Sequence, residues 1–168
     1  MKTSFKLLLR GAAALVALSL VSALSAQSEK IPHSERAFFE KAAKGGTKEV
    51  EISQAVVDRL TNPQVRDFAQ MMITDHTAVN AELTSLAVSK GITLPADSTK
   101  LGDKWAKKGG DLDEDYIEEM KDDHEDAVKL FEKAAKSPDP EVAAFAQKNL
   151  PALLHHLEMA KSLKKTVK

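Results

Sequence analysis

The chain has 168 residues, of which 43% are hydrophobic and 5% aromatic, with 24 basic and 25 acidic side chains and no cysteine. This length and apolar content predict one domain whose core is built mainly from Ala, Leu and Val. The composition excludes a disulfide-stabilised scaffold, and the near balance of charge argues against a general nucleic-acid binder, which normally has a net basic face.

The N-terminal segment has the pattern of an export signal. Basic residues at its start are followed by a largely apolar run over residues 7–20 and then by small residues. Cleavage after Ala23 or after Ala26 fits, and Ala26 is preferred. The run is interrupted by serines and is shorter than the roughly 20 apolar residues that a membrane span needs. We therefore predict a signal peptide over residues 1–26, with an uncleaved anchor as the alternative, and a periplasmic or secreted protein with no stable membrane span.

A short leader over residues 27–33 is expected to precede a first helix from Ser34 to about Leu60. Inward positions recur along it every three or four residues: Phe38, Ala42, Gly45, Glu49, Ile52, Val56 and Leu60. Each glycine of the Gly45-Gly46 pair weakens a helix by about 1 kcal/mol relative to Ala. The pair therefore predicts close approach of a neighbouring helix, a kink or a break.

A second helix is predicted from Asn62 and Pro63, a cap followed by a proline, to about Lys90. Its inward positions are Val65, Phe68, Met72, His76, Val79, Leu83 and Leu86. Residues 92–110 then form a connection long enough to cross the length of a helix. Trp105 is expected to hold this connection against the bundle.

Acidic residues 111–115 begin a third helix, with inward positions at Tyr116, Ile117, Met120, His124, Ala127, Phe131 and Ala134. Residues 137–140 end it and start a fourth, with inward positions at Val142, Phe145, Asn149, Leu153, His156, Ala160 and Leu163. Pro151 removes a backbone donor inside this helix and predicts a bend or break over residues 147–151.

An internal repeat decides the architecture. The pattern N/D-P-x-V-x-x-F-A-Q occurs over residues 62–70 and again over residues 139–147, each time opening the second helix of a hairpin. We therefore predict an all-α, ferritin-like four-helix bundle over residues 34–164, made of two helical hairpins joined by a long crossover segment. Residues 165–168 would be a basic tail.

Each predicted helix carries one ionisable residue on its inward face, near mid-height: Glu49, His76, His124 and His156. A buried, unpaired carboxylate costs several kcal/mol, so these groups should meet each other, an ion or ordered water. Three interpretations stay open. The residues form a hydrogen-bonded layer that fixes helix register, or they bind Zn, Cu, Fe or Mn, or they form a small-molecule pocket or proton-linked switch.

Neighbouring residues bear on the metal hypothesis. Asp75 and Asp123 each precede an inward histidine and are turned about 100° from it, which favours a supporting role. Met72 and Met120 lie one turn before His76 and His124; they would suit copper, or equally fill the core. These four residues are candidates for positions next to the ligands of the ion, where they would support the ligands without binding the ion themselves.

Sequence motifs for catalysis are missing. No E-x-x-H pair of the di-iron type, phosphate-binding glycine loop, H-E-x-x-H motif or ordered Ser-His-Asp set occurs. The sequence therefore specifies no reaction, and a non-catalytic protein is favoured over an enzyme.

Several segments resemble the exported bacterial proteins grouped as domain of unknown function 4142. They are Phe39-x-x-Ala-Ala-x-Gly-Gly46-x-x-Glu49-Val, Val65-x-x-Phe-Ala-x-Met-Met-x-x-Asp-His76, Tyr116-x-x-x-Met-x-x-Asp-His124 and Leu150-Pro-x-Leu-x-x-His156-Leu. The resemblance covers about residues 34–164. It implies a ferritin-like bundle in the periplasm, favours His156 over His155 as the inward residue, and implies no known activity.

The sequence thus predicts a periplasmic bundle that binds or buffers a metal ion at a mid-bundle His/Glu site. The alternative is a non-catalytic structural or stress-associated interaction protein with a buried polar layer. No nucleic-acid partner is expected, and both a monomer and a homo-oligomer stay open.

Overall fold

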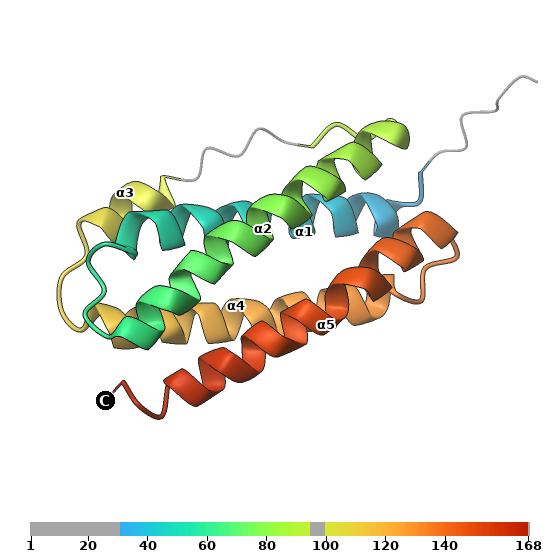
Figure 1. Ribbon diagram of the computed structural model, residues 1–168. Helices are drawn as coiled ribbons and strands as arrows, with labels where there is room; N and C mark the ends of the chain where they lie inside the picture. The colour runs from blue at the N-terminus through green and yellow to red at the C-terminus, as the bar shows by residue number, and fades with distance from the viewer. Residues whose placement is uncertain (1–30, 95–99, 168) are drawn as a thin grey trace, which may run out of the picture. The chain divides into compact units, whose positions relative to one another are not determined.

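The computed structural model describes residues 31–94 and 100–167, which belong to the unit Ile31–Lys168. The predicted signal peptide, residues 1–26, lies outside the described residues, as does most of the predicted leader. The helices are α1 (His33–Val56), α2 (Pro63–Ser89), α3 (Leu101–Ala106), α4 (Leu112–Ala134) and α5 (Pro140–Leu163), and no strand occurs in the described ranges (Figure 1).

The four long helices pair as two hairpins. α1 packs along α2 and α4 packs along α5, while α1 also packs against α4 and α2 against α5. The turn between α1 and α2 lies at one end of the helices, and the turn between α4 and α5 at the other (Figure 1). This arrangement confirms the predicted all-α bundle of two helical hairpins.

The repeated motif starts the second helix of each hairpin by the same physical means. The side chain of Asn62 accepts a hydrogen bond from the backbone N–H of Gln64, and Asp139 accepts from those of Glu141 and Val142. A proline follows each cap, where its missing N–H has no helical partner to lose.

The core consists of two apolar clusters. We call the first the Trp105 cluster; it comprises Ile52, Val56, Leu60, Val65, Phe68, Ala69, Met72, Trp105, Leu112, Tyr116, Ile117, Met120, Ala160, Leu163 and Val167. The second, the Phe38 cluster, comprises Phe38, Phe39, Ala42, Leu83, Ala87, Ile92, Val128, Phe131, Ala134, Val142, Phe145, Ala146, Leu153 and Leu157. The two copies of the repeat supply one cluster each. Val167 shows that the predicted basic tail contributes a buried side chain.

The connection between α2 and α4 contains a short helix, α3, that the sequence analysis did not predict. Trp105 on α3 is buried, as expected, and the guanidinium of Arg59 donates to the carbonyl oxygens of Trp105 and Lys108 at 2.8 and 2.5 Å. Ile92, at the start of the connection, packs in the Phe38 cluster. The connection therefore passes from one core cluster to the other, and residues 95–99 between them lie outside the described residues.

Helices α1 and α5 are continuous at the two places where the sequence allowed a break. α1 continues through Gly45 and Gly46, and α5 continues through Pro151. Gly46 lies under the side chain of Asn80 on α2, so close helix approach explains the glycine. Pro151 is exposed, so the carbonyl group that it leaves without a helical donor can meet water. α1 instead ends at Val56, four residues before the predicted Leu60.

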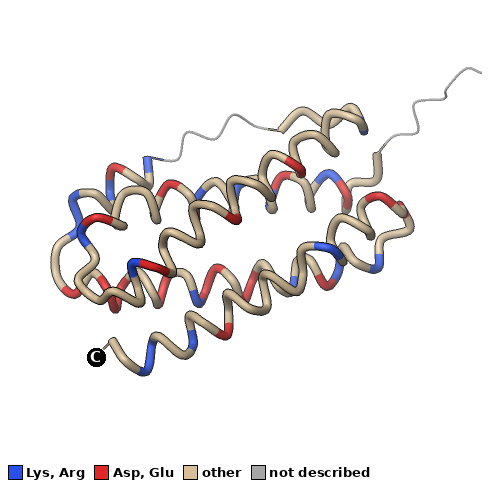
Figure 2. Tube along the Cα trace, in the orientation of Figure 1, with Lys and Arg blue, Asp and Glu red and all other residues tan. Residues whose placement is uncertain are grey.

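Charged residues of both signs occur along the helices, as Figure 2 shows. In the part of the chain that the structure describes, no helix is long and apolar enough to cross a membrane.

Candidate metal centre

The four predicted inward polar residues are all buried. Glu49 on α1, His76 on α2, His124 on α4 and His156 on α5 are each at most 4% exposed. On α1, α2 and α4 the residue lies in sequence between members of the two core clusters. On α5, His156 lies beside Leu157, the last member of the Phe38 cluster before Ala160 of the Trp105 cluster. The three imidazole rings are nearly equidistant, with centroid separations of 5.3, 5.5 and 5.4 Å. The structure therefore brings all four side chains into one polar layer.

Glu49 faces the Nδ1 atoms of two histidines. Its Oε2 lies 2.9 Å from Nδ1 of His76, and its Oε1 lies 3.3 Å from Nδ1 of His124. Nδ1 of His124 is also 2.8 Å from the carbonyl oxygen of Met120, which can only accept a hydrogen bond. Both Nδ1 atoms are therefore placed to carry the proton, and the lone pair of each neutral ring is then on Nε2.

His156 is oriented by a different carboxylate and through its other ring nitrogen. Its Nε2 lies 3.0 Å from Oδ2 of Asp75, so it is placed to donate across the interface between α5 and α2. The lone pair of neutral His156 is then on Nδ1. Asp75 precedes His76 in the sequence, yet it supports the histidine of a neighbouring helix.

One nitrogen of each ring remains without a hydrogen-bond partner among the described residues: Nε2 of His76, Nε2 of His124 and Nδ1 of His156. The three histidines can each offer one ligand atom such that all three atoms lie within 4.8 Å of one another. Nitrogens bound tetrahedrally to one ion at about 2.0–2.1 Å are roughly 3.4 Å apart, so modest ring rotations would close the set. Glu49 is not a member of this group, because its oxygens face the Nδ1 atoms.

The chain matches a protein family in sequence and a solved structure in fold. The family model described as Domain of unknown function (DUF4142) matches residues 21–163. The chain belongs to this family. Comparison with the curated proteins gives no match. Among solved structures, a DUF305 fragment from Deinococcus radiodurans is similar, with a TM-score of 0.69, 10% identity and coverage of 80% of this chain and 97% of that one. At that identity the likeness shows the fold alone.

The charges in the layer of this DUF4142 protein favour a proton on His76. Burial alone would lower the pKa of His76, but the charge and hydrogen bond of Glu49 outweigh it and raise the pKa. Burial likewise would raise the pKa of Glu49, yet His76, with smaller effects from the other two histidines, lowers it. In the metal-free protein these two residues therefore form an ion pair below the raised pKa of His76.

The other two histidines are held neutral. Burial lowers the pKa of His124, and the nearby His76 adds to this while Glu49 partly offsets it. Burial, together with His76 and His124, lowers the pKa of His156 to about 4, although Asp75 opposes the shift. Neutral imidazoles are the form that binds metal ions.

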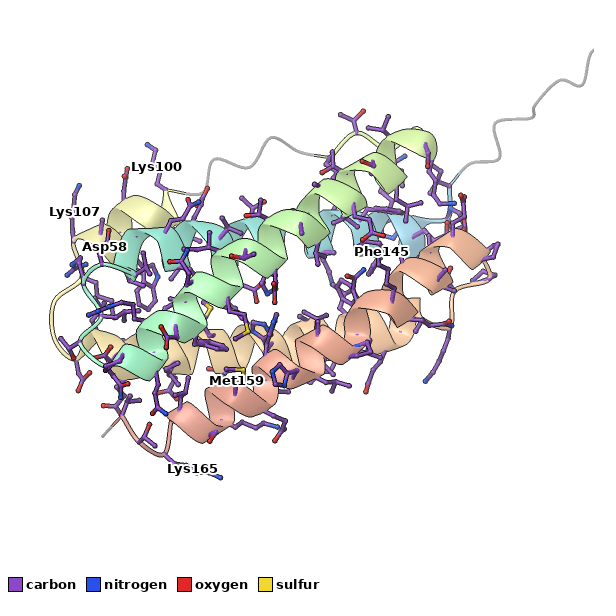
Figure 3. All side chains as sticks on the ribbon, viewed as in Figure 1. Asp58, Lys100, Lys107, Phe145, Met159 and Lys165 are labelled. Atoms are coloured by element: carbon purple, nitrogen blue, oxygen red, sulfur yellow. The ribbon has the colours of Figure 1, made fainter. Side chains whose placement is uncertain are left out.

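The remaining predicted neighbours lie around the layer. Asp123 accepts from Lys48 at 2.6 Å through Oδ1, while its buried Oδ2 has no partner among the described residues. Burial raises the pKa of Asp123 to about 6 despite Lys48. Met72 and Met120 are fully buried in the Trp105 cluster, and Met159 packs against it (Figure 3). All three methionines therefore contribute to the packing of this cluster.

Sequence reasoning missed Lys48. Its ammonium lies 2.6 Å from both Asp123 and Glu119, and so ties α1 to α4 next to the layer. A signal was available, since Lys48 directly precedes Glu49 just as Asp75 and Asp123 precede inward histidines. On α1, α2 and α4 the residue before the inward position pairs with a side chain of a neighbouring helix, whereas His155 on α5 is exposed.

Proposed function

We propose that this DUF4142 protein binds or buffers one transition-metal ion through three imidazoles, after export to the periplasm. The ligand atoms would be Nε2 of His76, Nε2 of His124 and Nδ1 of His156. Zn, Cu, Fe and Mn are the candidate ions, and imidazole ligands suit Zn, Cu and Fe best.

The observation that carries the proposal is the set of three buried ring nitrogens, from three different helices, that have no hydrogen-bond partner among the described residues. A buried acceptor without a partner costs about 1–3 kcal/mol. When all three rings are neutral, one water molecule donates only two hydrogen bonds and cannot satisfy all three nitrogens, whereas one cation can accept all three lone pairs. The ring nitrogens that face away from the proposed ion are near Glu49 or Asp75. Carboxylates on the far side of ligating histidines are a recurring support of metal sites.

In this proposal Glu49 orients ligands and is not itself a ligand. Its two oxygens are already placed against the Nδ1 atoms of His76 and His124. It also supplies negative charge next to the proposed ion. The four-residue ligand set expected from the sequence thereby becomes three ligands and one supporting carboxylate.

A polar layer that fixes the register of the helices is the second candidate, because the single side chain of Glu49 on α1 contacts histidines on both α2 and α4. With His76 protonated, its Nε2–H could donate to one neutral neighbour, which would leave one lone pair over. This candidate requires no ion and predicts that stability is independent of added metal.

Elemental analysis of the untagged protein purified from the periplasm, followed by titration of the metal-free protein with Zn²⁺, Cu²⁺, Mn²⁺ and Fe²⁺, tests the proposal. We expect one equivalent of at least one ion to bind and to raise the melting temperature. At a metal concentration 100 times Kd the gain in free energy of unfolding is about 2.7 kcal/mol. A variant with all three histidines changed to Gln should show no gain. The matched control is His155→Gln, which changes an exposed histidine next to His156. A parent protein that binds no ion would refute the metal proposal and favour the polar layer.

A further inference from the structure

A cavity of about 470 Å³ extends from the polar layer toward the Phe38 cluster. Glu49, His76 and Asp123 line it at the layer. Leu83, Phe131 and Leu153, which are members of the Phe38 cluster, line it on the other side. The size is within the range of small-molecule sites, about 300–1,000 Å³.

Between Lys41 and Glu49, the α1 wall of this cavity is made of small residues. Ala42, Gly45 and Gly46 line it, and a Cβ added at Gly45 would meet no atom within 4 Å. Asn80 faces this wall from α2, with its amide next to Gly46. The close approach of α2 to α1 explains the glycine at position 46 but not the one at position 45. Gly45 lines the cavity, and its lack of a side chain leaves space there.

The chemistry of the lining differs between its parts. The lining includes the apolar side chains of Val79, Leu83 and Leu130 and the exposed, positively charged side chains of Lys41 and Lys129. Asp126 pairs with Lys129 at 3.0 Å. Such a lining fits a ligand with an apolar body and tolerates an anionic group near Lys41.

Three protein ligands leave one position of a tetrahedral ion for an outside ligand. Of the three proposed ligands His76 lines the cavity; its Nε2 has no partner in the described part of the chain and belongs to a side chain that is 95% buried. We infer that the fourth coordination position of the ion opens into this cavity and takes a small Lewis base that has one donor atom and an apolar body. This inference rests on the metal centre proposed above and adds the class of its exogenous ligand.

The Co²⁺-loaded protein tests this inference, because the visible spectrum of Co²⁺ responds to its coordination. The probe is 4-phenylimidazole, which has one donor nitrogen and an apolar ring. We expect it to change the Co²⁺ spectrum of the parent and of Gly45→Ala with similar affinity. In Gly45→Phe, whose side chain would fill the cavity, binding of the probe should be at least tenfold weaker while Co²⁺ affinity is unchanged. Leu130→Trp, which fills the cavity from α4, should have the same effect and serves if Gly45→Phe does not fold.

The outcomes separate the two proposals. If Co²⁺ binds but the probe leaves its spectrum unchanged, or binds the filled variants as well as Gly45→Ala, the cavity inference is wrong and the metal centre stands. If neither Co²⁺ nor any other ion binds the parent, both are wrong.

Discussion

Nδ1 of His76 lies 2.9 Å from Oε2 of Glu49, and both side chains are at least 95% buried. This contact engages Nδ1 of His76 and leaves Nε2 as the nitrogen without a partner among the described residues. It also places a carboxylate directly behind a proposed ligand, where it increases the basicity of the imidazole. The orientation of His76 as a proposed ligand therefore depends on Glu49.

Glu49→Gln should weaken metal binding by about 10–100-fold, the usual effect of losing a carboxylate behind a ligating histidine. The amide is neutral and has only one acceptor oxygen for the two imidazole N–H groups. Competition against a chromophoric chelator measures the affinity. Glu40→Gln, at an exposed position of the same helix, is the matched control and should bind like the parent. Equal affinity in Glu49→Gln and Glu40→Gln would show that Glu49 does not orient the ligands.

The metal-free protein should lose stability between pH 6.5 and pH 4 in a way that depends on His156. Its pKa is lowered to about 4 by burial and by His76 and His124, so in this window the unfolded chain takes up a proton that the folded protein does not. The contribution to the free energy of unfolding is fully present above pH 6.5 and falls by about 3 kcal/mol on going to pH 4.

Urea unfolding at several pH values, with a chelator present, measures this slope. His156→Gln should give a shallower decrease than the parent over the same window. Asp123, whose pKa is raised to about 6, contributes a slope of opposite sign in both proteins and largely cancels in the comparison. His76 has a raised pKa, so its contribution is lost only as pH rises above 6.5. Identical slopes in parent and variant would contradict the assignment of a neutral, buried His156.

The two adjacent glycines of α1 should respond differently to alanine. Gly45→Ala should raise the free energy of unfolding by up to about 1 kcal/mol, because the new methyl group meets no atom within 4 Å and helix propensity improves. In Gly46→Ala the methyl group would lie 2.1 Å from the present position of Oδ1 of Asn80, so the gain should be smaller or reversed.

A double-mutant cycle with Asn80→Ala isolates this contact. The difference between Gly46→Ala and Gly45→Ala should disappear when Asn80 is shortened, as denaturant unfolding would show. Additive effects of Gly46→Ala and Asn80→Ala would mean that the close approach of α1 and α2 at this point is not energetically important.

Asp113→Asn should destabilise the protein by about 1–3 kcal/mol. The buried carboxylate of Asp113 on α4 accepts from the backbone N–H groups of Thr61 and Asn62 and from the Thr61 hydroxyl, and so joins the turn after α1 to the start of α4. The amide would keep the shape but lose the charge and one acceptor. Asp58→Asn, exposed in the same turn, should change thermal stability by less than about 0.5 kcal/mol. Similar losses in the two variants would rule out a special role for Asp113.

The helical periods in the sequence were sufficient to predict the fold class and the inward face of most helices, and the repeated motif at residues 62–70 and 139–147 predicted the pairing of helices. The periods gave the face of His124, residue counts from the hairpin turns gave the heights, and the family resemblance favoured His156 over the adjacent His155. They could not predict which ring nitrogen is directed inward, since that depends on side-chain torsions set by contacts between helices. The roles of Glu49 and Asp75 therefore became visible only in three dimensions.

The remaining differences also come from tertiary contacts. α3 has only six residues, too few for a clear period, and is fixed by burial of Trp105 and by the hydrogen bonds from Arg59. Pro151 is tolerated in α5 because Leu153 and Leu157 remain packed in the Phe38 cluster. Local sequence rules describe what such residues prefer in isolation, whereas packing decides the outcome.

X-ray absorption spectroscopy of the stoichiometric metal complex tests the central claim most directly, because it reports the ligands of the ion itself. With Zn²⁺ we expect three imidazole nitrogens at about 2.0–2.1 Å and one further light-atom ligand. The outer-shell scattering typical of imidazole should weaken when His124 is changed to Gln. A first shell of oxygen ligands without imidazole, or a protein that retains no ion at stoichiometric amounts, would contradict the account.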